Sequence, residues 1–185
     1  MESEKEFQQA PKNRNLNFSF KINKQMLRFL AIFSSLLALL YVLSIQFESY
    51  VPIFNMQTTS STLVQLLQIF GLKVTISANE VSLSNFVLEV VRQCTGLFEV
   101  ITLVAAVVAY PTNYKNKIKG IAIGLPLIYT FNIIRLVFLA YLGVYYFPLF
   151  EIVHDYILQI TFFSFVIFIW FFWLQTVVRK NVKIL

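Results

Sequence analysis

A stretch of 19 residues without a single charge, FLAIFSSLLALLYVLSIQF at positions 29–47, limits this chain more than any other feature. At 1.5 Å per residue, a helix of that length spans roughly 28 Å, close to the thickness of the hydrocarbon core of a bilayer. A secretory signal peptide would have a shorter apolar region, roughly 7–15 residues, followed by a small-residue cleavage site. No such site follows here, so we expect a retained first membrane span.

Three more apolar stretches follow along the chain. We expect the second span over 95–110, ended by Pro111, the third over 118–141 with a bend at Pro126, and the fourth over 152–176. Only 13% of the residues are charged, whereas a soluble domain averages about 25%. The fold class that we predict is an all-α membrane protein with about four transmembrane helices.

The longest segment between spans, residues 48–93, has a different pattern. Apolar residues at helical spacing predict a short extracytoplasmic helix over 60–70, which Gly71 would end. Alternating and β-branched residues then predict a small β-hairpin, or an extended segment, that leads into Cys94.

Basic residues give the orientation in the membrane. Twelve of the 15 Lys and Arg residues fall in segments that share one side if the N-terminus is cytoplasmic, and such residues concentrate on the cytoplasmic side. We therefore expect a multi-pass plasma-membrane protein with both termini inside, and this topology explains the net charge of +6 better than nucleic-acid binding does. The expected parts are a basic tail at 1–28, one transmembrane domain at 29–176 and a basic tail at 177–185.

This topology brings three chemically distinctive residues to the outer membrane level. Cys94 begins the second span, Arg135 lies roughly 25 Å from the inner start of the third, and His154 is near the outer start of the fourth. A thiolate is a nucleophile, histidine moves protons near neutral pH, and arginine can hold an oxyanion. The set suffices for acyl transfer through a thioester, although each residue alone is also compatible with inert packing or an interfacial position.

The order and spacing of CTG at 94–96, N-x-x-R at 132–135 and His154 resemble the exosortase/archaeosortase family over roughly residues 60–176. The resemblance implies a membrane cysteine transpeptidase that cleaves C-terminal sorting signals of exported proteins. Such a signal has a short motif, an apolar span and a basic tail. The new carboxyl end would pass to an acceptor, a lipid in at least part of the family.

Carried over by motif, Cys94 would be the nucleophile, His154 the general acid and base, and Arg135 the stabiliser of the oxyanion or substrate. The resemblance implies that the active site faces outside. No cofactor is expected. One cysteine and one histidine are too few for a disulfide framework or for a protein-only zinc site.

Four residues near these three are candidates for supporting roles. Asn132 lies one turn before the arginine and would orient its guanidinium or a substrate carbonyl, or serve only in helix packing. Gly96 would permit close approach to the cysteine, and Thr95 would cap the second span. Glu99 lies inside the apolar run and needs a partner, either the arginine or the substrate.

Two interpretations compete with the enzyme. A non-enzymatic membrane scaffold subunit would make Cys94, Arg135 and His154 unrelated packing residues. A small transporter would place Glu99 and Arg135 along a path, but it would need polar residues through the full bilayer depth, and the first and fourth spans have few.

Overall fold

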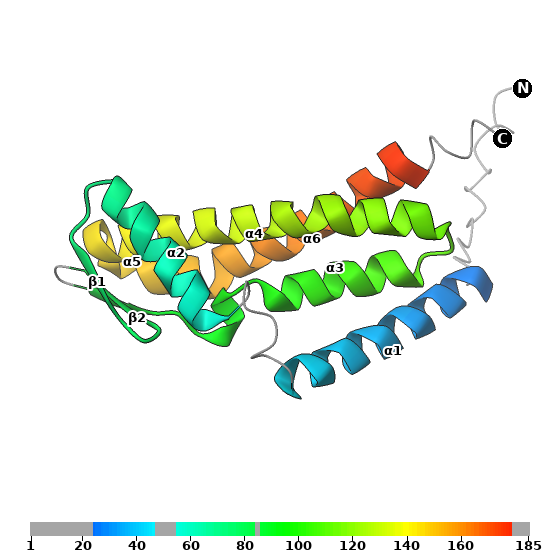
Figure 1. Ribbon diagram of the computed structural model, residues 1–185, viewed down its shortest axis with the longest axis horizontal. Helices are drawn as coiled ribbons and strands as arrows, with labels where there is room; N and C mark the ends of the chain where they lie inside the picture. Colours follow the sequence, from blue (N-terminus) through cyan, green and yellow to red (C-terminus); the bar gives the residue numbers. More distant parts are fainter. Residues whose placement is uncertain (1–23, 47–54, 84–85, 179–185) are drawn as a thin grey trace, which may run out of the picture.

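A computed structural model of the chain describes residues 24–46, 55–83 and 86–178. Four helices lie lengthwise in an elongated bundle (Figure 1): α1 (Lys24–Gln46), α3 (Leu97–Ala109), α4 (Tyr114–Tyr145) and α6 (Leu158–Trp173). Apart from the turn that continues α6, the remaining elements gather at one end, which we call the cap end. The opposite end, where α1 and α4 begin, is called the tail end.

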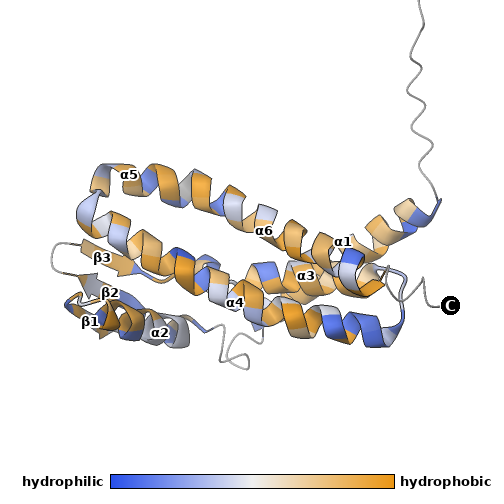
Figure 2. Ribbon diagram, turned by 90° about the horizontal axis from the view of Figure 1, so that it is seen from above, coloured by the Kyte–Doolittle hydropathy of each residue, from blue (hydrophilic) through white to orange (hydrophobic). Residues whose placement is uncertain are grey.

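Three of the described helices are long and apolar enough to cross a membrane, namely α1, α4, and α6 with the turn that continues it to Val178. Figure 2 shows apolar residues along these helices and polar residues in the first turns of α4. Helix α3 is apolar but has only 13 residues, fewer than a span of about 20. The prediction of an all-α membrane fold is confirmed. The second span, expected over 95–110, corresponds to α3, which is shorter than expected.

Helix α2 (Met56–Ile69) and a three-stranded antiparallel sheet form most of the cap. The strands follow the order β1 (Val74–Ser77), β2 (Glu80–Leu83) and β3 (Phe86–Glu89). Alternate residues point inward, because a strand has a side-chain period of two; Val81 is fully buried and Leu88, its partner across the sheet, nearly so. The predicted β-hairpin is therefore confirmed, with a third strand added.

Helix α2 begins and ends where its sequence provides caps. The side chain of Asn55 accepts a hydrogen bond from the Gln57 N–H at 2.9 Å. At the other end Gly71 has a φ of +81°, and the Leu72 N–H donates to the Leu67 carbonyl at 3.0 Å. Glycine is favoured at such a left-handed helix end, as predicted for Gly71.

Helix α4 continues through Pro126 without interruption. Between the expected third and fourth spans, the sequence with Pro148 predicts a turn over 142–151, but the structure has a helical corner there. Helix α5 (Phe147–Ile152) has Pro148 in its first turn, where the missing N–H of proline breaks no helical hydrogen bond. The π-helical turn η4 (Val153–Ile157) then leads directly into α6. Helical structure therefore continues past both Pro126 and Pro148.

The expected basic tails lie largely outside the described residues. Residues 1–23 and 179–185 are not part of the description. Residues 24–28, expected in the first tail, form the first turns of α1.

Two apolar clusters organise the interior. The bundle cluster runs along α3, α4 and α6, and the cap cluster joins α2 and the sheet to the cap end of α4. Tyr129 of α4 packs against both clusters. Cys94 belongs to the cap cluster, so the structure places it where the cap meets the bundle.

Candidate active site

Cys94 ends the 3₁₀ turn η3 (Arg92–Cys94), between β3 and α3. Its backbone N–H donates to the Val91 carbonyl at 2.8 Å. The side chain is only 3% exposed and packs within the cap cluster. The turn therefore holds the thiol in one position, away from bulk water.

Thr95 joins this turn to the helix that follows. Its hydroxyl donates to the Arg92 carbonyl at 2.9 Å and accepts from the Leu97 N–H at 3.4 Å. The side chain is fully buried. The N-cap of α3 is Gly96, one residue after the predicted Thr95, and the Thr95 hydroxyl contacts the first N–H of the helix from the preceding position.

Asn132 reaches the cysteine from the middle of α4. Its side-chain N–H donates to the carbonyl oxygen of Cys94 at 2.9 Å, and the residue is fully buried. Gly96 has a φ of +80°, and a Cβ there would come within 3.2 Å of the Asn132 side chain. A larger residue would have to displace the asparagine, so the close approach expected at Gly96 is to this side chain.

Arg135 follows one turn later on α4. The guanidinium carbon lies 4.9 Å from the centre of the Phe162 ring of α6, a cation–π arrangement. The positive charge and a side-chain hydrogen bond from Arg135 both act on the Cys94 thiol. Arg135 thus connects the thiol to α6.

Burial raises the pKa of the Cys94 thiol above its ordinary value, and the nearby Arg135 charge opposes this effect only in part. Burial disfavours the charged thiolate, whereas a neighbouring cation favours it. The resting sulfur is therefore mainly the neutral thiol at neutral pH. A nucleophilic reaction at this sulfur needs a base that removes the proton.

His154 lies in η4, at the same end of the bundle. Its ring stacks on Phe150 with 5.6 Å between centroids and 3° between planes. Phe150 packs against the cap cluster that contains Cys94, and so does Leu158, one turn after His154. The structure brings Asn132 and Arg135 directly to the cysteine and connects His154 to it through Phe150.

Glu99 lies in the first turn of α3 and is half-buried. The charge of Glu99 raises the pKa of the Cys94 thiol, whereas the charge of Arg135 lowers it. Within the part of the chain that the structure describes, its buried Oε2 atom has no hydrogen-bond partner. Glu99 also lines a hollow of about 370 Å³ between α3 and α6, together with Gln159 and Ser164.

A second hollow of about 550 Å³ lies between α1, the start of α3 and the first turn of α6. Its polar lining includes Arg92, Gln93 and Gln159. Arg92 is exposed whereas Cys94 is buried, because the 3₁₀ turn sends their side chains in different directions. This second hollow opens beside the cysteine turn, whereas the hollow at Glu99 begins in the first turn of α3; Gln159 lines both.

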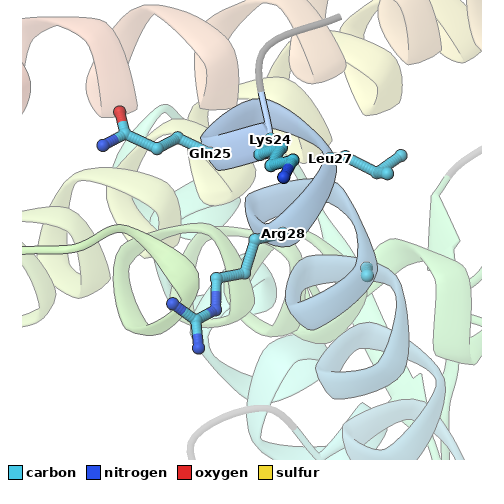
Figure 3. Close-up of a pocket in the computed structure, with 5 residues that line it drawn as sticks. Lys24, Gln25, Leu27 and Arg28 are labelled. Carbon is cyan, nitrogen blue, oxygen red and sulfur yellow. The ribbon is translucent and has the colours of Figure 1, made fainter.

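A third hollow lies at the tail end, at the start of α1 (Figure 3). Lys24, Gln25, Leu27 and Arg28 line it. Phe29, the next residue, stacks near Trp170 and Tyr110, which marks this region as the far end of the bundle from Cys94. It contributes nothing to the cysteine site.

No group of three or more His, Cys, Asp or Glu residues that could hold a metal ion occurs among the described residues.

Three residues near the candidate site were not predicted from the sequence: Phe162, Phe150 and Gln159. The two phenylalanines are indistinguishable in sequence from the other 18. Gln159, a polar residue in an apolar stretch, carried a signal that could have identified it.

Comparison with known proteins gives one match. The family model described as Transmembrane exosortase (Exosortase_EpsH) matches residues 22–174, which include the cysteine turn, α4 and the start of α6. No curated protein and no solved structure matches the chain. The family match covers most of the chain and independently supports the resemblance found in its motifs. This protein therefore belongs to the transmembrane exosortase family.

Proposed function

We propose that this protein is a membrane cysteine transpeptidase that cleaves the C-terminal sorting signals of exported proteins, with Cys94 as its nucleophile. Its family acts on exported proteins that carry such signals. The observation that carries the proposal is the pairing of Cys94 with α4: Asn132 holds the carbonyl of the cysteine, and Arg135 presents its charge to the thiol.

In the first half of the reaction, the Cys94 sulfur attacks the carbonyl carbon of the scissile peptide bond. The negative charge that develops on the carbonyl oxygen is stabilised by Arg135, since a fixed cation at low dielectric stabilises an oxyanion. The carbon–nitrogen bond then breaks and the leaving amine takes a proton. A thioester to Cys94 results.

His154 is the proton carrier in this scheme. It takes the thiol proton and gives it to the leaving amine, the usual role of an imidazole near neutral pH. The raised thiol pKa makes this base necessary. The His154 ring stacks on Phe150, which packs against the apolar cluster that contains Cys94.

In the second half, an acceptor nucleophile attacks the thioester carbonyl carbon and the Cys94 sulfur leaves. We propose a membrane lipid as the acceptor. The two hollows near Cys94 are lined in part by the spanning helices α1 and α6, so an acceptor held in the bilayer can approach sideways.

We further propose that residues 29–176 act as one domain in the plasma membrane, with the cap end and the active site outside and both termini cytoplasmic. The three lysines in the first turns of α4 lie at the tail end. Because basic residues concentrate on the cytoplasmic side, they support an inner tail end. A substrate whose apolar span lies beside the bundle would then present its motif to Cys94.

The test uses a tagged exported protein from the same genome that ends in a motif, an apolar span and a basic tail. Cys94→Ala and Arg135→Ala should abolish processing of this substrate while the variants stay membrane-inserted. Glu80→Gln, at an exposed position of β2, serves as a control and should process normally. Full processing by Cys94→Ala would instead favour the non-enzymatic scaffold.

A further inference from the structure

Three buried polar atoms without a hydrogen-bond partner lie on the residues around Cys94. Within the described residues, these are Oε2 of Glu99, Oδ1 of Asn132 and Nε of Arg135. Two are acceptors and one is a donor. Buried polar atoms are normally paired, because leaving one unpaired costs roughly 1–3 kcal/mol. A ligand with N–H groups could donate to the two oxygens, and an oxygen of the same ligand could accept from Arg135.

Of the three groups, the carboxyl group of Glu99 is the one whose burial costs the most free energy when it has no partner. An acidic group within an apolar helix needs a cation or several N–H donors beside it. Arg135 supplies charge at a distance, but the Oε2 atom has no hydrogen bond in the described part of the chain. The proposed leaving amine departs with the cleaved tail in the first half of the reaction. The acceptor of the second half is then the substrate group that Glu99 can pair with.

The hollow beside Glu99 offers room for such a second substrate. Its polar side chains, Gln159, Ser164 and Thr102, stand among apolar ones on α3 and α6. Its rim carries exposed apolar side chains, with Ile160 at 67% and Phe163 at 55% exposure. A polar recess with an apolar rim suits a molecule that joins a polar head to an apolar body.

We propose that Glu99 binds the primary ammonium group of the acceptor and takes one of its protons, in the hollow between α3 and α6. This inference rests on the proposed transpeptidase function and adds the chemical class of the acceptor. The amine-bearing molecule comes either from the membrane, as a lipid headgroup, or from water. The apolar rim favours the lipid.

One proton of the ammonium moves to the Glu99 carboxylate, which leaves a neutral amine beside the thioester. The amine nitrogen attacks the thioester carbonyl carbon, and the carbon–sulfur bond breaks as the carbon–nitrogen bond forms. The second nitrogen proton passes to the departing sulfur through His154. The products are an amide, the free Cys94 thiol and a protonated Glu99.

The experiment uses the full-length protein in lipid vesicles with the tagged substrate, and mass spectrometry of the new C-terminus. One set of vesicles contains phosphatidylethanolamine and a second set phosphatidylcholine, whose quaternary nitrogen cannot attack. A third arm adds soluble ethanolamine to the phosphatidylcholine vesicles. The variants are Glu99→Gln, Glu99→Asp and the surface control Glu80→Gln.

Wild-type protein should give an amide-linked product in phosphatidylethanolamine vesicles and only a hydrolysed product in phosphatidylcholine vesicles. Glu99→Gln should still cleave the substrate, but the ratio of amide-linked to hydrolysed product should fall about a hundredfold or more, since a positioned general base contributes roughly 10²–10⁴-fold. Glu99→Asp keeps a carboxylate and should retain measurable transfer. Glu80→Gln should match wild type.

An amide formed only with soluble ethanolamine would support the amine chemistry and assign its source to water. An unchanged product ratio in Glu99→Gln would overturn the inference, as would cleavage without amide product in every arm. Those results would leave the Cys94-dependent cleavage intact. A complete lack of Cys94-dependent cleavage would overturn the transpeptidase proposal and the acceptor site with it.

Discussion

The side-chain N–H of Asn132 donates to the backbone carbonyl oxygen of Cys94 at 2.9 Å, joining residues 38 positions apart in the sequence. The bond fastens the cysteine turn to α4. Arg135 follows one turn later on the same helix, and its charge acts on the thiol. A single helix therefore positions both the backbone of Cys94 and the cation beside its sulfur.

Asn132→Ala should lower the free energy of unfolding by about 1–3 kcal/mol, since it leaves the buried Cys94 carbonyl without a partner. The loosened turn should also expose the sulfur, so alkylation of Cys94 by N-ethylmaleimide should become faster than in wild type. Thermal unfolding in detergent and alkylation kinetics measure the two effects. The exposed Asn113, changed to alanine, is the matched control, and equal behaviour of the two variants would contradict the anchoring role.

Gly96→Ala and Gly71→Ala form a second pair, because both glycines have a φ near +80°. Each substitution should cost roughly 1–2 kcal/mol in unfolding free energy from the left-handed backbone alone. A Cβ at Gly71 meets nothing within 4 Å, whereas one at Gly96 meets Asn132 at 3.2 Å. Only Gly96→Ala should therefore also change Cys94 alkylation and substrate processing. Similar alkylation rates in both variants would refute the coupling between Gly96 and the cysteine.

Arg135→Gln should shift the pH profile of Cys94 alkylation to more alkaline values. Arg135 lowers the thiol pKa against the larger effect of burial, so its removal raises that pKa and reduces the thiolate fraction at any pH below it. The rate at neutral pH should therefore fall. Arg92→Gln serves as the control, since Arg92 is two residues from the cysteine but exposed, and it should leave the profile in place. A shift to lower pH in Arg135→Gln would contradict this account.

Orientation in the membrane can be tested with new cysteines in a Cys94→Ala background. Ser77→Cys at the cap end and Asn113→Cys at the tail end both lie at exposed positions. A membrane-impermeant maleimide applied to intact cells should label Ser77→Cys at once and Asn113→Cys only after permeabilisation. The reverse pattern would show that the cap end is cytoplasmic.

The overall fold followed from patterns in the sequence that depend on local physics. Uncharged stretches predicted the long helices, and Gly71 predicted the end of α2 because left-handed backbone favours glycine. The placement of Cys94 and Arg135 at one level followed from helix rise together with the topology that the basic residues indicate. These features depend on few long-range contacts.

Other features depend on packing that the sequence does not display. Helix α3 is short because the cysteine turn and Gly96 occupy the residues before it. The corner at α5 is helical although Pro148 indicated a turn, since proline is accommodated in a first helical turn. Nothing in the sequence singles out Phe162 as the ring beneath Arg135.

The central claim is that Cys94 forms a covalent acyl intermediate, and intact mass measurement tests it most directly. Wild-type protein incubated with the tagged substrate in phosphatidylcholine vesicles should gain the mass of the cleaved substrate on Cys94, and hydroxylamine should remove it, as expected of a thioester. Cys94→Ala should gain no mass. Processing that continues with no adduct on Cys94, or with an adduct on another residue, would contradict the account.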